Sequence, residues 1–386
     1  MSRSHYARLG VDAGKEAVRK AFATVIDNDF LGAWVNIVSD PTKKGGVFTQ
    51  HMDGDGSKFI QRILVYRETG DIAVFRGATD DALSMNTGDI AAAGFTAGVI
   101  TVTDVLNVNG FNVPKQHIME QIGDRLSELI KLYRKYGFQI YFLGGETADL
   151  PHQVQTVAFD IAVHARAMKK DLVLGNVQHG DIIWGFASDG QAVWEDELNS
   201  GIMSNGLTLA RMALMSRAYT KKYPDLVRIG GAYEGRFCVA DSEGRAHALI
   251  SPTRQWAIVI KMLLDKLKER KATHLLHGIT MNTGGGATKI AHLGTGGITY
   301  QKKMPYPPEI FHEIQIASNE SWFDMYKGFN CGIGIDIIGD EKINLVVQEV
   351  SAETRVILHR LGMCHYRSRN EKNKVELITP FGTFTF

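Results

Sequence analysis

The stretch His51-Met-Asp-Gly-Asp-Gly-Ser-Lys58 carries more chemical information than any other part of this chain. It follows a β-rich run, residues 46–52, and gathers carboxylates, glycines, a hydroxyl and a lysine within a few positions. Carboxylates bind hard divalent cations, glycines let the backbone approach phosphate oxygens, and a lysine neutralises them. Asp-Gly pairs also form ordinary turns, so this motif alone leaves both a plain turn and an ion–phosphate site open.

A second acid-bearing stretch runs from Asp80 to Gly94 and is mostly small and apolar, which predicts a closely packed helix. Asp80, near its beginning, could simply complement the helix dipole. Asp89 lies beside Ile-Ala-Ala-Ala and would be costly to bury without a partner or an ion. Asp81 and Asp89 are about 12 Å apart along an ideal helix, so they would not share one ion. Metal binding by both acids would require two metal positions or a broken helix.

A third polar stretch is Leu143-Gly-Gly-Glu-Thr-Ala-Asp-Leu-Pro151, directly after the β-rich run 138–143. We expect a loop at the carboxyl end of a strand, which is a common ligand position in α/β sheets. A plain loop with a helix cap is the alternative. Taken together, the three stretches indicate a magnesium–nucleotide site rather than three unrelated turns.

The second half of the chain adds four further motifs: Ser204-Asn-Gly206, Ser251-Pro-Thr-Arg254, Thr283-Gly-Gly-Gly286 and Phe329-Asn-Cys-Gly-Ile-Gly334. A triple glycine lets backbone amides face an anion, or it forms a bend where two backbones meet. Arg254 could fork onto a phosphate or a carboxylate, or form a surface ion pair. Cys331 has no base nearby in sequence and is interpreted as a packing residue rather than a nucleophile.

The bulk composition excludes several protein classes. With 386 residues, 44% of them hydrophobic and 22% charged, the chain is typical of a globular protein of two domains. A net charge of +1 gives no footprint for nucleic acid or for an anionic membrane. The beginning lacks the apolar region of a secretion signal, and no run of about 18 apolar residues predicts a membrane span. Three widely spaced cysteines favour free thiols in a reducing cytoplasm.

The order of predicted elements indicates an α/β or α+β layer fold. The expected strands are the β-rich runs 46–52, 72–76, 98–103, 138–143, 154–163 and 181–186. Apolar residues from Ile118 to Tyr133 recur at helical spacing, and Gly137 is a suitable C-terminal cap. Further helices are expected from about Asn205, capped by Ser204 or Asn205, and near Pro252. The element order begins again near residues 166–172, so we place a domain boundary there, with domains 1–168 and 169–386.

Together these motifs resemble one family, aminoimidazole ribonucleotide synthetase, also called phosphoribosylformylglycinamidine cyclo-ligase. They follow the family's order along nearly the whole chain: Arg8-Leu-Gly-Val-Asp-Ala-Gly14, Asp53-Gly-Asp-Gly-Ser-Lys58, Asp89-Ile90, Gly144-Gly-Glu-Thr-Ala-Asp149, Ser204-Asn-Gly206, Pro252-Thr-Arg254, His277-Gly278, Thr283-Gly-Gly-Gly286 and Met325-Tyr-Lys-Gly-Phe-Asn-Cys-Gly332. One such motif is weak, but this many in order indicate homology.

The resemblance implies a two-domain α/β fold of the aminoimidazole ribonucleotide synthetase type. The amino-terminal domain would bind ATP and metal, and its strands would pair across a homodimer into a barrel. The carboxy-terminal α/β layer domain would complete the active site. In the implied reaction, ATP phosphorylates the formyl oxygen of formylglycinamidine ribonucleotide, and ring closure releases ADP, phosphate and aminoimidazole ribonucleotide. Such phosphoryl transfer relies on positioning and charge neutralisation.

The resemblance also implies roles for particular residues. Catalysis would use Lys58, which would meet the transferred phosphate, together with Asp53 and Glu146. Magnesium would be held by Asp53, Asp81, Asp89 and Glu146. ATP and phosphate groups would be bound by Gly54, Gly56, Ser57, Lys58, Gly144, Gly145, Thr147, Asn205, Arg254, Gly284, Gly285 and Gly286. A lysine in a loop should not carry the core, so replacing Lys58 is expected to remove turnover with little loss of fold.

Several positions depart from the family pattern. Met203 and Met281 stand where the family carries histidines, and Gly88 stands where it carries asparagine. Thr288-Lys289-Ile290 replaces the family's Glu-Asn, and residues 191–198 form an insert. These changes leave two alternatives open: another ATP-using member of the superfamily, or a nucleotide-binding paralogue without catalysis.

Overall fold

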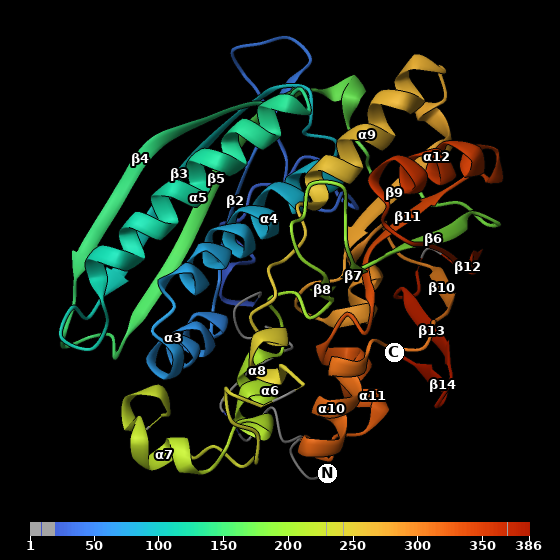
Figure 1. Ribbon diagram of the computed structural model, residues 1–386. Helices are drawn as coiled ribbons and strands as arrows, with labels where there is room; N and C mark the ends of the chain where they lie inside the picture. The colour runs from blue at the N-terminus through green and yellow to red at the C-terminus, as the bar shows by residue number, and fades with distance from the viewer. Residues whose placement is uncertain (1–8, 10–19, 229, 242, 369) are drawn as a thin grey trace.

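The computed structural model describes residues 9, 20–228, 230–241, 243–368 and 370–386. The amino-terminal motif Arg8–Gly14 lies outside the described residues, apart from Leu9. The strands form two large sheets, and helices pack against both (Figure 1). The α/β class expected from the sequence is therefore confirmed.

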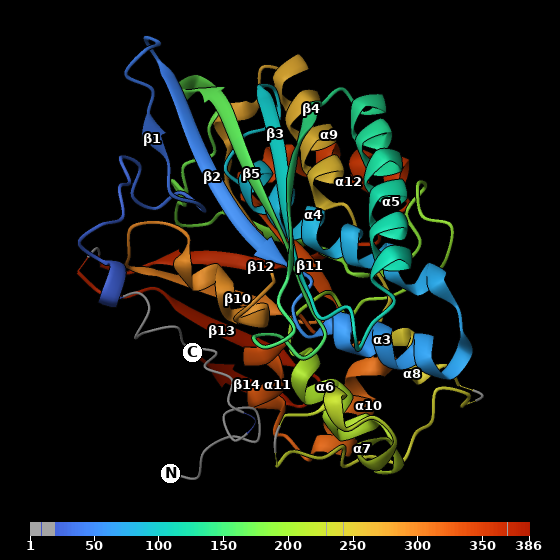
Figure 2. The ribbon, with the colours of Figure 1, turned by 90° about the vertical axis from the view of Figure 1, so that its left-hand side faces the viewer.

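The first sheet has five strands in the order β1-β2-β5-β3-β4. Their bounds are β1 Val38–Ser39, β2 Gly46–Gly54, β3 Val99–Val108, β4 Gln139–Asp149 and β5 Val157–Met168. Neighbours are antiparallel except β3 and β4, which run parallel because helix α5, Lys115–Lys135, connects them. Helices α4, Arg76–Ala92, and α5 pack together against one side of this sheet (Figure 2).

The second sheet has seven strands in the order β14-β13-β10-β12-β6-β11-β9. Their bounds are β6 Ile182–Ala187, β9 Leu276–Met281, β10 Ile298–Lys303, β11 Ile333–Gly339, β12 Leu358–Tyr366, β13 Lys374–Thr379 and β14 Gly382–Thr385. A short hairpin, β7 Asp189–Gly190 with β8 Asn199–Ser200, carries the inserted residues 191–198. The first sheet takes its strands from residues 38–168 and the second from residues 182–385, while the domain boundary itself stays a prediction.

The remaining helices are α3 Lys58–Thr69, α6 Leu207–Leu214, α7 Ala218–Lys222, α8 Arg245–Ala248, α9 Trp256–Glu269, α10 Glu309–Ser318, α11 Trp322–Gly328 and α12 Asn344–Thr354. Short 3-10 helices are η1 Ile72–Phe75, η2 Lys169–Asp171, η3 Pro224–Leu226, η4 Thr273–Leu275, η5 Gly286–His292 and η6 Glu341–Ile343. Within the described part of the chain, no helix combines the length and the apolar character that crossing a membrane requires.

Helix α4 is the element that joins the two layers. It packs on β2 and β5 of the first sheet and also on α9 and β9 of the second half. Every residue from Gly77 to Ala92 is buried, which explains why this helix is built from small side chains. Acids expected on this helix therefore lie in the interior of the molecule rather than on its surface.

The structure corrects four of the expected local elements. Residues 72–75 form η1 rather than a strand, because Asp71 caps the turn by accepting from the Ala73 amide. Residues 144–149 continue β4 and are not a loop, since they keep their ladder with β3. Helix α6 begins at Leu207 with Gly206 as its N-cap and no capping side chain. Helix α9 begins at Trp256, four residues after Pro252.

Helix α5 agrees with its periodicity. Its buried residues include Ile118, Ile122, Leu126, Leu129 and Tyr133. The chain leaves this helix through Gly137, which has a left-handed φ of 80°.

Candidate functional site

Lys58 begins helix α3 and is completely buried, so the expected loop position is wrong. Its ammonium lies 2.9 Å from Asp81 Oδ1 and donates to the carbonyl oxygens of Met203, at 3.0 Å, and Ser251, at 2.5 Å. Burial lowers the pKa of Lys58, and the Asp81 charge counteracts that effect. The lysine thus connects the beginning of α3 to two segments of the second half of the chain.

Asp81 is saturated with donors. Besides Lys58, it accepts from the Arg62 guanidinium, from the Thr253 amide at 2.7 Å and from the Thr253 hydroxyl at 2.5 Å. Although burial raises the pKa of Asp81, the two cations hold it well below its usual range. Arg62 also faces the buried Asp55, whose pKa is raised by burial. We call Lys58, Arg62, Asp55 and Asp81 the inter-half cluster.

Asp89 lies near the end of α4 and has a separate set of partners. Its Oδ1 accepts from the indole N–H of Trp34 at 2.7 Å. Its Oδ2 is 3.2 Å from His51 Nε2 and 3.6 Å from Lys289 Nζ. Burial alone would raise the pKa of Asp89, but Lys289 and His51 hold it well below its usual range.

His51 is a cation in this arrangement. The Asn86 amide nitrogen donates to the carbonyl oxygens of Asp53, Ala82 and Ile161, so its Oδ1 faces His51 Nδ1 at 2.9 Å. With an acceptor at each ring nitrogen, the imidazole carries both protons. Burial is the largest single effect on His51 and lowers its pKa, but the hydrogen bond and charge of Asp89, together with Asn86 and the Asp53 charge, raise that pKa overall.

The glycine-rich segment of the second half approaches Asp89 through Lys289, which lies on η5. The Lys289 ammonium also donates to the Thr283 hydroxyl and lies 4.8 Å from the centre of the Trp34 ring. Asn205 faces Gly284, and its side-chain nitrogen has no hydrogen-bond partner within the described residues. The structure thus brings Asn205, Gly284 and Asp89 into one neighbourhood, although they are far apart in sequence.

Two of the three glycines in this segment have positive φ. Gly285 has φ 100°, and Gly286 has φ 55° with the Phe329 carbonyl oxygen only 2.3 Å from where a Cβ would lie. A side chain at Gly286 would therefore collide with backbone. Gly286 corresponds to the bend between two backbones that the sequence left open.

Asp53, the penultimate residue of β2, lies beside a second carboxylate. Asp53 Oδ1 accepts from the Gly54 amide at 2.9 Å. A Cβ on Gly54 would lie 2.2 Å from Asp160 Oδ1, on the neighbouring strand β5. Burial raises the pKa of Asp160, and the Asp53 charge raises it further. Of the residues that follow β2, Gly56 has φ 60° and the Ser57 hydroxyl accepts from Thr208 at 2.9 Å.

The Gly144–Asp149 motif lies along β4, three strands away from Asp53 of β2 in the first sheet. Glu146 is exposed, and its Oε1 accepts from the Thr147 amide at 3.0 Å. The register aligns Glu146 with Val105, Val105 with Asp160, and Asp160 with Gly54. Three strand spacings, about 14 Å, therefore separate Glu146 from Gly54, the neighbour of Asp53 at the end of β2.

Two glycines of this motif have different surroundings. Gly145 has no room for a side chain, because a Cβ there would lie 1.8 Å from Asp104 Oδ1. Gly144 has φ 91° and open space around it.

Arg254 forks onto a carboxylate within the chain. Its Nε and Nη2 each lie 2.9 Å from an oxygen of Glu195, which belongs to the 191–198 insert. The guanidinium is buried and also donates to the carbonyl oxygens of Ala187, Asp189 and Gly190. A cavity of about 650 Å³ lies between this insert, the beginning of α4 and residues 251–255.

The four carboxylates assigned to magnesium do not form one metal site in this structure. Among the described residues, no group of three or more His, Cys, Asp or Glu side chains is arranged to hold a metal ion. Asp81 is occupied by Lys58 and Arg62, whereas Asp89 is surrounded by an indole N–H and two cations. The donor set at Asp89 does not fit a metal ion as it stands, and the metal assignments stay predictions.

Sequence reasoning missed Trp34, His51, Asp160, Glu195 and Lys289. His51 opens the motif that began the sequence analysis, and Glu195 lies in the insert, so both carried a signal. Lys289 lies in a stretch that departs from the family pattern, so it carried a signal too. Trp34 and Asp160 carried none, because only tertiary packing and strand register place them beside Asp89 and Asp53.

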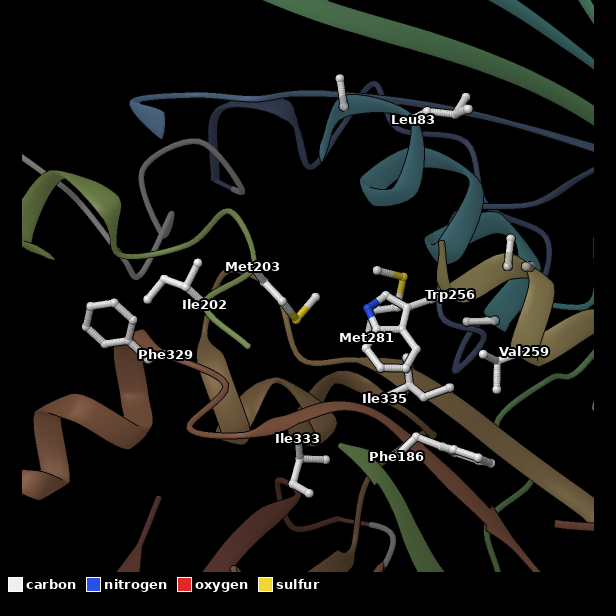
Figure 3. Close-up of a cluster of buried hydrophobic side chains, with 14 of the residues drawn as sticks. Leu83, Phe186, Ile202, Met203, Trp256, Val259, Met281, Phe329, Ile333 and Ile335 are labelled. Atoms are coloured by element: carbon white, nitrogen blue, oxygen red, sulfur yellow. The ribbon is translucent and has the colours of Figure 1, made fainter. Parts of the chain in front are cut away.

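The positions that depart from the family pattern lie together in the interior. Met203, Met281 and Ile290 belong to the hydrophobic core. Figure 3 shows Met203 and Met281 in a close-up of this core. A Cβ on Gly88 would lie 2.0 Å from Met281 Sδ, so these two departures are in direct contact. Met203 adopts a left-handed φ of 50°, which is uncommon for a residue with a side chain.

Known proteins resemble both the sequence and the fold. Phosphoribosylformylglycinamidine cyclo-ligase of Methanocaldococcus jannaschii is 30% identical over 291 residues, covering 75% of this chain and 70% of the relative. The cyclo-ligase of Methanococcus vannielii is 29% identical over 311 residues, covering 80% and 75%. No family model matches the chain.

The fold of this chain is also similar to the folds of solved structures. Phosphoribosylformylglycinamidine synthase II of Thermotoga maritima aligns with a TM-score of 0.55 at 10% identity, covering 99% of this chain and 50% of that one. Thiamine monophosphate kinase of Aquifex aeolicus aligns with a TM-score of 0.51 at 11% identity, covering 98% of each chain.

From the identity and coverage of its sequence relatives, the chain belongs to the phosphoribosylformylglycinamidine cyclo-ligase family.

Proposed function

We propose that this chain is an enzyme that uses ATP to cyclise formylglycinamidine ribonucleotide to aminoimidazole ribonucleotide. The observation that carries the proposal is the 30% identity to a cyclo-ligase along three quarters of the chain. The site geometry supports it, because Asp89, Asn205 and the Gly284–Gly286 segment come together from distant parts of the sequence.

The roles of individual residues follow as part of this proposal. Asn205, whose amide nitrogen lacks a partner among the described residues, would donate to a phosphate oxygen beside Gly284. Asp53 and Asp160 place two carboxylates at the end of β2, and that charge would be neutralised when magnesium accompanies ATP. Lys58 would reach a transferred phosphate only by exchanging Asp81 for it, so a catalytic Lys58 requires the inter-half cluster to open.

The test is ADP release by the purified chain given ATP, magnesium and formylglycinamidine ribonucleotide, with and without the ribonucleotide. We expect ribonucleotide-dependent ADP release together with an equal amount of the imidazole product. A matched pair of variants, Asp53→Asn and the exposed Asp71→Asn, should separate loss of turnover from a general effect of removing a carboxylate. ADP release without imidazole product would contradict the cyclisation.

A second candidate is an ATP-dependent enzyme of the same superfamily that acts on a different acceptor. The observation that favours it is the buried contact between Met281 and Gly88, with Met203 in the same core, where the family carries polar groups. Losing three polar side chains changes which polar groups of a substrate the site can hydrogen-bond, and therefore which substrate it selects. Tight binding of ATP without turnover of the ribonucleotide would favour this candidate.

We also propose a homodimer formed through the outer face of the five-stranded sheet. The residues of β5 alternate between buried and partly exposed, so only one face of the sheet is covered within the chain. Met52 and Tyr141 are 60% and 46% exposed on the other face. Light scattering after size exclusion should give twice the mass of 42.7 kDa, and Tyr141→Lys should shift it towards the monomer. A cytoplasmic location stays a prediction.

A further inference from the structure

The surroundings of Asp89 contain an unusual concentration of positive charge for a carboxylate expected to bind a metal. The Oδ2 atom is shared by His51 Nε2, at 3.2 Å, and Lys289 Nζ, at 3.6 Å, while Oδ1 is taken by Trp34. Of the roughly four lone-pair directions of a carboxylate, Trp34 and His51 take two, and the Lys289 ammonium faces the same side of Oδ2 as an ion-pair partner beyond hydrogen-bond distance.

Lys289 is held in place by more than its attraction to Asp89. Its ammonium donates to the Thr283 hydroxyl and stands over the face of Trp34, whose N–H binds the same carboxylate. Trp34 therefore binds Asp89 through its indole N–H and Lys289 through the face of its ring. These two contacts hold the carboxylate and the ammonium in place relative to each other. The carboxylate itself is nearly buried, with its side chain 6% exposed.

A divalent cation at Asp89 would meet this preformed charge arrangement. It would lie close to the Lys289 ammonium in partly buried surroundings, where like charges repel strongly. The chain also carries Lys289 within the Thr288–Ile290 stretch, where relatives of the family carry Glu-Asn. Lys289 of this stretch places a positive charge beside Asp89.

We propose that Lys289 is the built-in counter-ion of Asp89 and occupies the position that a divalent cation would need, so that this carboxylate binds no such cation. Replacing the ammonium with a neutral side chain then creates a divalent cation site at Asp89. The inference rests on the proposed function only in placing Asp89 at the nucleotide site. It does not depend on which acceptor is converted.

The test is a titration of the full chain with Mn²⁺ at pH 7.5 without nucleotide. Electron paramagnetic resonance measures the free ion, and the number of Mn²⁺ ions bound per chain is obtained by difference. We expect Lys289→Gln to bind one Mn²⁺ more than the wild-type chain. Affinity at that site should rise about tenfold or more, since a unit charge within 4 Å is removed. Lys289→Met, which keeps the apolar stem over Trp34, should give the same gain, and Lys289→Arg should behave as the wild type.

Two further variants identify the carboxylate concerned. Adding Asp89→Asn to Lys289→Gln should abolish the extra site. Lys266→Gln, which removes a lysine paired with Glu353 on the surface at 2.7 Å, should change nothing. Circular dichroism confirms that each variant is folded before titration.

The proposal is overturned by any of three results: equal stoichiometry in the wild type and in both neutral variants, an extra ion that persists with Asp89→Asn, or a wild-type ion that is lost with Asp89→Asn alone. None of these results depends on turnover. If the cyclisation assay failed, the Mn²⁺ titration would still decide whether Lys289 keeps a divalent cation from Asp89.

Discussion

At the scale of single residues, the molecule buries several charged side chains, and some of them pair with residues from distant segments. Asp80 lies in the first half of α4 with its side chain 6% exposed, and Arg125 of α5 forks onto it at 2.8 and 2.9 Å. Burial raises the pKa of Asp80, and Arg125 counteracts that effect. Asp80 therefore acts as an anchor between helices rather than as a residue that complements the dipole.

Removing that anchor should be costly. We expect Arg125→Leu to lower the free energy of unfolding by about 3 kcal/mol, because Asp80 would stay buried without its cation. The matched control is Arg76→Ala, which also removes a partner of Glu128 but leaves Asp80 paired, and should cost under about 1 kcal/mol. Urea unfolding measures both, and equal losses in the two variants would contradict the assignment.

His277 and Asp181 predict a dependence of stability on pH. The hydrogen bond from His277 Nδ1 to Asp181, at 2.8 Å, raises the pKa of His277 above its usual range, although burial lowers it. A histidine with a raised folded-state pKa stabilises the fold below its unfolded pKa of about 6.5, and that stabilisation is lost as the pH rises through the folded value.

We therefore expect His277→Gln to destabilise the protein more at pH 5.5 than at pH 9. Urea unfolding at several pH values measures the difference between variant and wild type. A difference that does not vary with pH would show that the imidazolium contributes nothing.

At the scale of elements, the sequence predicted a closely packed helix at α4, but it did not predict which elements pack against that helix. Its run of small residues predicted close packing, and all residues from Gly77 to Ala92 are buried. Gly88 is a glycine because the Met281 thioether of β9 fills the space beside it. The helix and the strand are joined in the tertiary structure, so the reason for this glycine lies far away in the sequence.

This contact predicts a coupling between two positions. Gly88→Ala would gain about 1 kcal/mol from helix propensity alone, but overpacking against Met281 should make it destabilising by about 1–3 kcal/mol. In a Met281→Ala background the same change should become stabilising. A double-mutant cycle by thermal or urea unfolding measures the coupling, and additive effects would mean that Met281 moves aside freely.

At the scale of the whole molecule, the inter-half cluster ties the first sheet's helices to the second half of the chain. Lys58 donates to Met203 and Ser251, Arg62 donates to the Ile250 carbonyl at 3.1 Å, and Thr253 donates to Asp81. All of these partners come from residues 203–253, which are contributed by the other half. The cluster therefore couples the folding of one half to that of the other.

This role changes the expected effect of replacing Lys58. We now expect Lys58→Met to lower the free energy of unfolding by about 3 kcal/mol, because it breaks a buried ion pair and leaves two carbonyl oxygens without a donor. The exposed Lys44→Met should stay within about 0.5 kcal/mol of the wild type. Denaturant unfolding decides, and a loss below 1 kcal/mol for Lys58→Met would contradict a structural role for the cluster.

The sequence by itself determined the α/β class, the helix that carries the apolar residues from Ile118 to Tyr133, the close packing of α4 and the family, because these depend on local periodicity and on the order of motifs. The tertiary structure alone decided the partner of each charge. Lys58 meets Asp81, Asp89 meets Lys289, and Arg254 meets Glu195. Which side chains face each other is set by strand register and by packing between segments up to 200 residues apart, and neither leaves a local pattern in the sequence.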